Sequence, residues 1–400
     1  MGLFNIFNIV SATPLAPDAT MVTSTQSTGE DLNPFNAPSN VTGVDIQRII
    51  FDTLAKVGPE MQPVPWAAER WAPVTQTAVD VYLRPGMKFH DGQPMTADDV
   101  KFTYDEMKRW KVPLYVAMLQ PIKQVRVLDR LRLRFELEHP YAPLYMQTFS
   151  MIPIVPRHLW ENVVPRKGLK APWEWTESQA YVGSGPFKLV HFRPGQEIKL
   201  VRNDEHHRPP KARFWVLAFF ANVNAEFLAF KKGIVDFTTG RGLTGPQMVE
   251  ARTVPHLATV EMEDVGVYWM EFNLRENSPF RNHAFRHALA HTIDYTTIVK
   301  TILAGQGVQG RGVIAPANKF WHNPHIPSGE VEGPHYHQYD PVKARRILQE
   351  AGYEWDSRGR LYYPKDYRPQ VLPRSAGLPG EVRTAKAHAS GKVEGPGCRM

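Results

Sequence analysis

Cysteine is almost absent from this 400-residue chain, and its scarcity excludes two kinds of site. The single cysteine, Cys398, cannot close an intramolecular disulfide, and it leaves a cysteine-based zinc site without a second thiolate. Folding therefore has to rely on a hydrophobic core. The supply is ample, because hydrophobic residues make up 42% of the chain. At this length we expect two or three structural units rather than one core.

Long apolar runs are also missing. No stretch approaches the roughly 20 apolar residues of a membrane-spanning helix, so we predict none. The apolar run Gly2–Val10 has no Lys or Arg before it and is shorter than the core of a secretory signal. We therefore interpret residues 1–20 as an N-terminal segment that holds at most a remnant of such a signal.

A strong excess of one charge is lacking too. The chain holds 47 Lys and Arg against 40 Asp and Glu, and seven of these basic and three of these acidic residues fall within residues 365–400. Nucleic-acid binding needs basic residues gathered along one groove or helix, with aromatic residues between them. The basic residues show no such clustering, so we expect no nucleic acid as a partner.

Motifs for catalysis or nucleotide binding are missing as well. The chain contains no H-E-x-x-H zinc motif and no Walker loop. Residues 183–186, Gly-Ser-Gly-Pro, differ from a nucleophile elbow, because a proline stands where the following helix should supply an oxyanion donor. Asp98 and Asp99 fit the N-terminus of a helix, where negative charge is favoured. We therefore predict no enzyme activity and no cofactor.

One histidine pattern is compatible with a metal site. His283, His287 and His291 are four residues apart, so on a helix they would share one stripe and offer two imidazoles to a divalent metal. Phe285 and Leu289 mark a buried face opposite this stripe, which favours a solvated surface instead. A metal site would also need a third ligand and supporting hydrogen bonds, so we predict no metal.

The periodicity of the apolar residues predicts mixed α and β structure. Apolar residues recur at helical spacing from Asp45 to Leu54, and a capping box of Thr96 and Asp99 begins a helix that ends near Lys108. The further helices expected are 225–231, 283–304 and 341–351. The strands expected from alternation are 21–25, 79–83, an antiparallel pair over 122–137, a hairpin of 187–192 and 197–201, and 214–219, 259–262 and 268–273.

The longest specific pattern runs over residues 82–100, YLRPGMKFHDGQPMTADDV. It resembles the signature of the peptide/nickel class of extracellular solute-binding proteins of ABC importers, bacterial solute-binding protein family 5. Further stretches agree with this family in the same order: residues 183–187, 201–203, 272–274, 285–294 and 340–353. The resemblance spans roughly residues 21–364.

The resemblance implies an α/β fold of the periplasmic-binding-protein type, a two-lobed clamshell with an accessory α+β domain inserted in the first lobe. The expected division is residues 21–50 and 176–265 for the first lobe, 51–175 for the accessory domain, 266–364 for an incomplete second lobe and 365–400 for a disordered basic tail. The tail has lost all apolar periodicity. A shifted reading frame or a truncated gene is our interpretation of it, and a natural basic linker is the alternative.

The resemblance also implies a function. The expected protein is the substrate-binding component of an ABC importer, a periplasmic or otherwise extracytoplasmic monomer that binds di- or oligopeptides between its lobes and delivers them to permease subunits at the membrane. A nickel or metal-chelate carrier of the same transporter class is one alternative, and a hydrolase on a related scaffold is another. Because the second lobe is expected to be incomplete, we predict weak or absent peptide binding.

A peptide cleft needs apolar walls, aromatic faces and exposed backbone groups that hydrogen-bond to the ligand's main chain. The candidates for these walls are Asn33, Phe35, Ser184, Gly185, Tyr268, Trp269 and Asn273. Each has a structural alternative. Asn33 with Pro34 also fits a simple turn, residues 183–186 fit a tight turn at a lobe junction, and Tyr268 with Trp269 fits a core strand.

Overall fold

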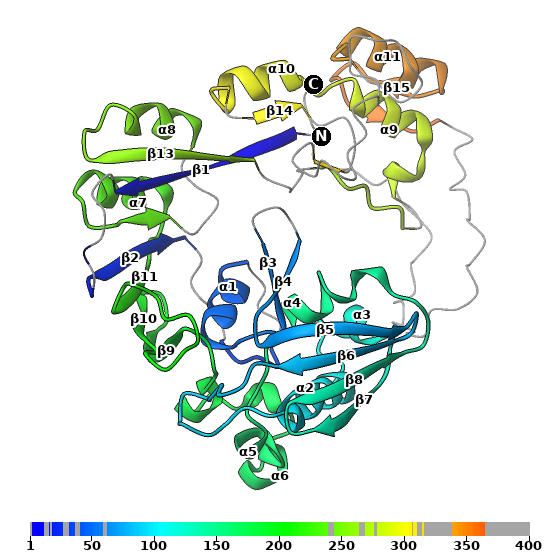
Figure 1. Cartoon of the computed structure of the whole chain (residues 1–400). Coiled ribbons are helices and arrows are strands. Elements are labelled where there is room, and N and C mark those ends of the chain that lie inside the picture. Colours follow the sequence, from blue (N-terminus) through cyan, green and yellow to red (C-terminus); the bar gives the residue numbers. More distant parts are fainter. Residues whose placement is uncertain are drawn as a thin grey trace. The chain divides into compact units, whose positions relative to one another are not determined.

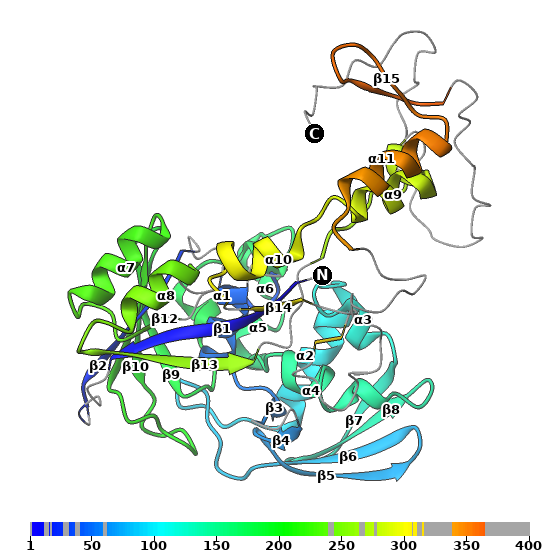
Figure 2. The same cartoon turned by 90° about the horizontal axis from the view of Figure 1, so that it is seen from above.

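The computed structural model divides the chain into two compact units, whose elements are labelled in Figures 1 and 2. The larger unit is Phe7–Val260, and the smaller unit combines Met1–Ile6 with Glu261–Met400. The structure describes residues 2–11, 16, 18–26, 32–36, 41–58, 62–238, 244–263, 269–275, 278–305, 307–309, 314–315 and 338–364. The predicted tail, 365–400, and the candidate residue Tyr268 lie outside the described residues.

A mixed sheet forms one layer of the larger unit. Its central strand, β2 (Thr20–Thr25), pairs in parallel with β11 (Phe214–Phe219) on one side and with β12 (Phe237–Thr238) on the other. The remaining strands are β9 (Phe187–Arg193), β10 (Glu197–Arg202) and those parts of β1 (Gly2–Ser11) and β13 (Leu257–Glu263) that belong to the larger unit. The strand order is β13-β1-β12-β2-β11-β10-β9, so β9 is an edge strand.

Three helices accompany this sheet: α1 (Val41–Ile50), α7 (Val223–Lys231) and α8 (Gly245–Ala251). Ile46 and Ile50 of α1 are fully buried in the main core of the unit. Phe230 of α7 and Met248 of α8 share a second, smaller core. The apolar face of each helix is therefore covered, which is the main source of stability for helices this short.

A four-stranded antiparallel sheet forms the other layer, with the order β5-β6-β8-β7. Its strands are β5 (Ala68–Thr75), β6 (Ala78–Leu83), β7 (Ile122–Asp129) and β8 (Arg132–Leu137), and α2 (Ala97–Arg109) packs against it. Tyr104 of α2 is buried and meets the Phe135 ring at 4.9 Å between centroids. The predicted capping box of Thr96 and Asp99 begins this helix.

The main core runs through both layers, since one cluster of buried residues includes Ile50, Phe135 and Leu217. The first-lobe and accessory segments expected from the sequence therefore share one core, and the boundary between them stays a prediction. The shorter elements of the larger unit are β3 (Ala55–Val57), β4 (Pro63–Pro65), α3 (Val116–Leu119), η1 (Ala142–Leu144), α4 (Thr148–Met151), α5 (Arg157–Trp160), α6 (Val163–Lys167), η2 (Pro172–Glu174) and η3 (Ser178–Tyr181).

The described part of the smaller unit is mainly helical. Its elements are η4 (Pro279–Arg281), α9 (His283–Ala290), α10 (Tyr295–Thr297), a π-helical turn (Ile298–Ile302), β14 (Gly307–Gln309), α11 (Pro341–Glu350), β15 (Glu354–Trp355) and β16 (Leu361–Tyr362). α9 and α11 pack together around Ala288, Leu348 and Tyr353. β14 pairs antiparallel with the first residues of β1.

Most of the expected elements are confirmed, and two are wrong. The helix expected over 283–304 stops at Ala290, because the Asp294 side chain accepts the Thr297 N–H at 3.0 Å and caps a new helix. Residues 269–275 form no strand, although 268–273 was expected to be one.

The strand β1 lies in the segment that was interpreted as a signal remnant. Within the described part of the chain, every helix falls short of what crossing a bilayer requires.

Candidate functional site

The carboxyl ends of the parallel strands in the larger unit form the first candidate site. Two strands that follow β2 along the chain, β11 and β12, lie on opposite sides of it. In open α/β sheets such an arrangement sends the loops after the strands in opposite directions and leaves a crevice in which ligands bind. We call Ser24, Thr25, Gln26, Glu226 and Thr238, which lie at these strand ends and on α7, the strand-end site.

Glu226 organises the strand-end site. Its side chain is buried, with a relative exposure of 1%, and the Ser24 hydroxyl donates to its Oε1 at 2.6 Å. The Thr238 hydroxyl also faces Oε1, at 3.3 Å, and the Gln26 amide donates to Oε2 at 2.8 Å. A buried carboxylate is tolerated only when hydrogen bonds replace its water, and these donors supply them. The carboxylate thereby ties the ends of β2 and β12 to α7.

Sequence reasoning missed this site. The available signals were a polar run, Thr23–Thr25, inside an expected strand and a single acid in the otherwise apolar helical segment 225–230. Neither signal is specific, because a lone Glu on a short helix is usually solvated. Only the parallel pairing of β2 with β12 brings residues 24 and 238 to the same carboxylate.

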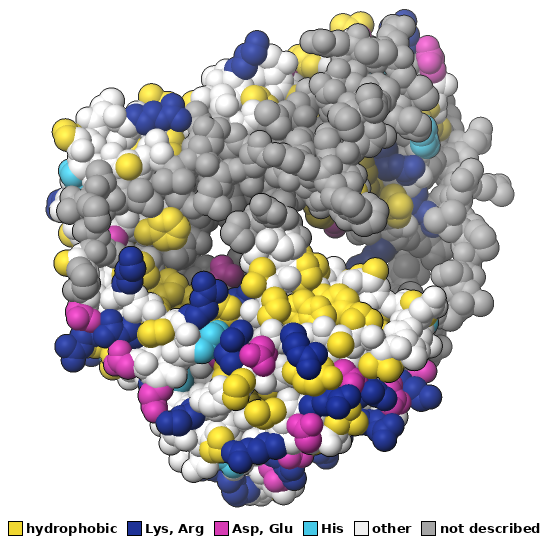
Figure 3. Space-filling view, viewed as in Figure 1, with side chains coloured by type: hydrophobic (Ala, Val, Ile, Leu, Met, Phe, Trp, Pro, Cys, Tyr) yellow, Lys and Arg dark blue, Asp and Glu magenta, His cyan; other side chains and the backbone are white. Residues whose placement is uncertain are grey.

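An apolar surface lies elsewhere on the larger unit. Figure 3 shows hydrophobic side chains gathered over β4, α4 and the start of β5. Trp71 of β5 stacks on Tyr145 at 5.3 Å between ring centroids, and both rings are half-buried. Val57, at the end of β3, is 45% exposed. An aromatic and aliphatic surface of this kind suits contact with apolar ligand groups.

Asn33 and Phe35, the first two predicted wall residues, lie in the core. The Asn33 side-chain amide donates to the carbonyls of Pro172 and Trp175 at 3.0 and 2.9 Å, and its Oδ1 accepts the Phe35 N–H. Phe35 is 2% exposed and packs on Trp160 at 4.7 Å. These contacts fix loop 32–36 to the segment around residue 172. They agree with the alternative interpretation of Asn33 and Pro34 as a simple turn.

Ser184 and Gly185 are also buried, in a turn against the end of α1. The Gly185 N–H donates to the Ile50 carbonyl at 2.8 Å, and the Ser184 hydroxyl accepts the Asp52 N–H at 3.3 Å. A Cβ on Gly183 would lie 2.0 Å from the Ile50 carbonyl oxygen, and one on Gly185 would lie 2.2 Å from that of Ile49. Both positions therefore require glycine because two backbones approach closely.

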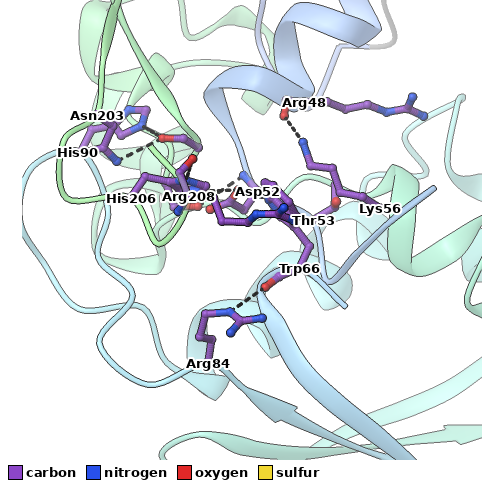
Figure 4. Close-up of polar contacts among 12 residues, drawn as sticks. Arg48, Asp52, Thr53, Lys56, Trp66, Arg84, His90, Asn203, His206 and Arg208 are labelled. Atoms are coloured by element: carbon purple, nitrogen blue, oxygen red, sulfur yellow. Dashed lines mark hydrogen bonds and ion pairs between the residues drawn. The ribbon is translucent and has the colours of Figure 1, made fainter. Parts of the chain in front are cut away.

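A buried polar cluster surrounds this turn, and most of its members appear in Figure 4. We call it the Asp52 cluster, and it consists of Asp52, Lys56, Trp66, His90, Ser184, Gly185, Asn203, His206 and His207. Asp52 and His206 are buried, and Oδ1 of Asp52 accepts the Trp66 indole N–H at 2.6 Å and lies 3.3 Å from Nε2 of His206. The cluster joins residues from both predicted segments, the first lobe and the accessory domain.

Burial sets the protonation of two histidines in this cluster. The pKa of His90 is lowered to about 4, mainly because burial disfavours the charged ring. Burial and then the neighbouring His206 lower the pKa of His207 to about 4. Nδ1 of neutral His90 accepts the Gly183 N–H at 3.2 Å, so Nε2 donates to the Gly185 carbonyl at 3.0 Å. The ring thereby fixes the turn.

The Asp52 cluster lacks the geometry of a hydrolytic triad. The Ser184 hydroxyl is occupied by the Asp52 backbone N–H, and within the described residues no histidine nitrogen bonds to it. Nucleophilic catalysis needs that contact, so that the imidazole can take the hydroxyl proton. The geometry therefore favours a structural role for Ser184.

The predicted histidine stripe lies along α9 and its C-cap, His291. Its rings are 5.9 Å apart between His283 and His287 and 5.2 Å apart between His287 and His291. In the described parts of the chain, no group of three or more His, Cys, Asp or Glu is placed to hold a metal. The expected solvated stripe is wrong at one end, since His291 is 1% exposed and its Nδ1 lies 2.7 Å from the Gln338 carbonyl.

Of the three remaining predicted wall residues, Tyr268 lies outside the described residues, and Trp269 and Asn273 lie in the smaller unit. Trp269 is 53% exposed, and its indole N–H donates to Glu271 at 2.6 Å. Asn273 is exposed, and its Oδ1 accepts the Arg275 N–H at 3.0 Å. Both side chains are accessible to solvent, whereas those of Asn33, Phe35 and Ser184 are not.

Comparison with known proteins defines the class. The family model for bacterial extracellular solute-binding proteins, family 5 Middle, matches residues 62–387, and the chain belongs to this family. The match continues beyond residue 364, where the resemblance found in the sequence was expected to end. The family and the mixed α/β, two-lobed fold class predicted from the sequence are both confirmed.

Particular relatives can then be named. The oligopeptide-binding protein AppA of Bacillus subtilis is 26% identical over 331 residues, which cover 80% of this chain and 57% of AppA. The structure of AppA in complex with a nonapeptide has a TM-score of 0.72 at 24% identity and covers 87% of this chain and 67% of that one.

Two more relatives differ in what their names describe. A putative ABC transporter peptide-binding protein of Brucella ovis is 26% identical over 277 residues, 67% of this chain and 48% of the relative. NikA from Brucella suis, in complex with Fe(III)-EDTA, has a TM-score of 0.64 at 20% identity and covers 86% of this chain and 67% of that one. The chain spans about half the length of the curated relatives it matches.

Proposed function

We propose that this chain binds peptides outside the cytoplasmic membrane and delivers them unaltered to the permease of an ABC importer. One observation carries the proposal. Sequence and fold both match the same relative, the oligopeptide-binding protein AppA, whose structure holds a nonapeptide. The family description, extracellular solute-binding proteins, supports an extracytoplasmic location and a role in binding rather than catalysis.

We place the peptide at the strand-end site of the larger unit, where Gln26 is exposed and the buried side chains of Ser24, Thr25, Thr238 and Glu226 support the strand ends from behind. Its strand ends carry hydroxyl and amide groups, and Glu226 holds them in a fixed arrangement. Hydrogen bonds to a ligand's main chain are common to all peptides, so such a site tolerates different side chains. Trp269 and Asn273 remain proposed contacts from the smaller unit, and the division into residues 21–50 and 176–265, 51–175 and 266–364 remains a proposed assignment.

Isothermal titration of the 400-residue chain with a nonapeptide tests the proposal. We expect saturable binding, weaker than nanomolar, and a peptide of unchanged mass when it is recovered. Glu226→Gln should weaken binding by about tenfold, because an NH₂ group replaces one of the two oxygens that accept the strand-end donors. Glu250→Gln is the matched control, since Glu250 is exposed on α8 and pairs only with Lys231 among the described residues.

Three outcomes would contradict the proposal. Cleavage of the peptide would support the hydrolase alternative instead. Retention of nickel or an iron chelate through mild purification, with no heat on addition of peptide, would support a metal-chelate carrier. Absence of both peptide binding and bound metal would leave the chain without the proposed activity.

A further inference from the structure

The edge strand β9 presents an unpaired side to a groove. β9 ends the strand order of its sheet, and β10 is its one partner among the strands that the structure describes. Among the described residues, no backbone group of Lys188–Phe192 bonds to a backbone partner outside β10. The opposite side of the strand therefore keeps free N–H and C=O groups, which is the arrangement that accepts an added strand.

The groove beside β9 has a volume of about 550 Å³. Five consecutive residues of β9, Lys188–Phe192, line one wall, and the other wall comes from His90, Asp91 and the segment 176–182. Successive side chains of a strand point to opposite faces, so one face alone cannot supply five consecutive lining residues. The groove therefore follows the free backbone edge of the strand.

A β-bulge limits how much of this edge is regular. The pairing of β9 with β10 shifts between Lys199 and Leu200, which leaves Val190 without a partner, and its side chain is 49% exposed. A bulge on an edge strand interrupts long-range pairing and discourages aggregation. A visiting strand must therefore be short, with two or three residues paired on either side of Val190.

The charges on β9 indicate which partner fits. The strand carries Lys188, His191 and Arg193 and no acid. His191 and Arg193 are already held by Glu197, at 2.8 and 3.5 Å. The Lys188 ammonium lies 3.3 Å from the His90 carbonyl, and no described carboxylate is within ion-pair distance of it.

We propose that β9 is a docking edge for a short extended segment of another protein, with an acidic residue opposite Lys188. Strand addition supplies main-chain hydrogen bonds, and the cross-strand ion pair supplies register and selectivity. A second copy of this chain fits less well, because pairing two β9 strands would bring their cations together. This surface is separate from the strand-end site and does not depend on the proposed peptide transport.

The probe is a labelled seven-residue peptide with blocked termini, alternating Thr and Val around one central Glu, and its matched form carries Lys instead of Glu. Fluorescence anisotropy with the full chain should show the Glu peptide binding about tenfold more tightly than the Lys peptide. Lys188→Glu should reverse that order. Lys199→Glu, on β10 and outside the groove, should leave it unchanged, since Lys199 lies over the Phe214 ring at 4.8 Å.

Backbone pairing has its own control. N-methylation of alternate amides in the Glu peptide should abolish binding, because it removes the donors that would pair with β9, and an excess of unlabelled nonapeptide should not displace the probe. The proposal is overturned if the probe does not bind at millimolar concentration, if the N-methylated form binds equally well, or if Lys188→Glu leaves the order of affinities unchanged. Concentration-dependent dimers that compete with the probe would assign the edge to a second copy.

Discussion

Gly185 has no space for a side chain, so the packing of its turn against α1 requires glycine at this position. An added Cβ would lie 2.2 Å from the Ile49 carbonyl oxygen, which belongs to helix backbone and cannot turn away. Gly185→Ala should therefore force the turn away from α1 and lower the free energy of unfolding by about 3 kcal/mol. Urea unfolding followed by circular dichroism measures this loss.

Gly195→Ala is the matched control for that experiment. Gly195 lies in the turn between β9 and β10 with φ +71°, and a Cβ there would meet no atom within 4 Å. Its substitution should cost only the left-handed backbone strain, about 1 kcal/mol. Equal losses for the two variants would show that close approach to α1 does not matter.

His90 should make stability depend on pH. Burial lowers its pKa from 6.5 to about 4, so the folded protein takes up this proton less readily than the unfolded chain. The stabilisation is complete above about pH 6.5 and is lost as the pH falls to about 4, at a cost on the order of 3 kcal/mol. The pKa of His207 is lowered to the same region, so its effect has the same sign.

Urea midpoints measured at about pH 7 and about pH 5 test this expectation. The unsubstituted chain should lose stability at the lower pH, and His90→Gln should lose clearly less, because an amide does not titrate. His139→Gln, at an exposed position, should behave like the unsubstituted chain. A pH profile that His90→Gln leaves unchanged would rule out the buried ring as the source.

At the scale of elements, one buried acid joins two strands. Asp80 of β6 is 2% exposed, and its carboxylate accepts hydrogen bonds from Arg132 and Arg134 of β8. The hydrogen bond from Arg134, followed by that from Arg132, holds the pKa of Asp80 below its ordinary value. Asp80→Ala should leave two guanidinium groups without their partner and cost about 2 kcal/mol in urea unfolding.

Glu136→Ala provides the comparison within the same sheet. Glu136 pairs with Arg126 at 3.2 Å, and both side chains reach solvent. An exposed pair contributes little, so its loss should cost clearly less stability than the loss of Asp80. If Asp80→Ala is as mild as Glu136→Ala, the buried network does not stabilise the pairing of β6 with β8.

Local sequence patterns predicted the helices and strands that are determined by residues close together in the sequence. The capping box at Thr96 and the alternation over 122–137 each carry their signal within a few residues, and α2, β7 and β8 form where expected. At Asp294 the helix could either continue or end at a capping side chain. The periodicity of the apolar residues cannot distinguish these two outcomes. β1 was missed because its apolar residues also fit the beginning of a signal.

The candidate site was less predictable because its contacts are distant in sequence. Glu226 meets Ser24 across 202 residues, and no spacing rule links them. The amide of Asn33 could hydrogen-bond to a ligand or to the protein. Only the fold shows that it donates to the carbonyls of Pro172 and Trp175. Polar residue type therefore predicted a polar role, but whether the partner was ligand or protein depended on tertiary packing.

At the scale of the whole molecule, the chain forms two compact units with separate cores. The larger unit has a continuous core that includes Ile50, Phe135 and Leu217, and the smaller unit has its own around Leu348 and Tyr353. Units with separate cores are expected to move relative to each other unless a large apolar interface joins them. Ligand binding can shift such an equilibrium only if the ligand binds one arrangement more tightly.

We predict that a bound peptide favours a closed arrangement of the two units. Small-angle X-ray scattering should show a smaller radius of gyration with saturating nonapeptide than without it, because a ligand that binds one arrangement more tightly shifts the equilibrium toward that arrangement. Glu226→Gln, at a peptide concentration too low to saturate it, should keep the larger radius, and Glu250→Gln should close like the unsubstituted chain. An unchanged radius, with titration showing full occupancy, would contradict the predicted closure and would mean that the peptide is held by one unit alone.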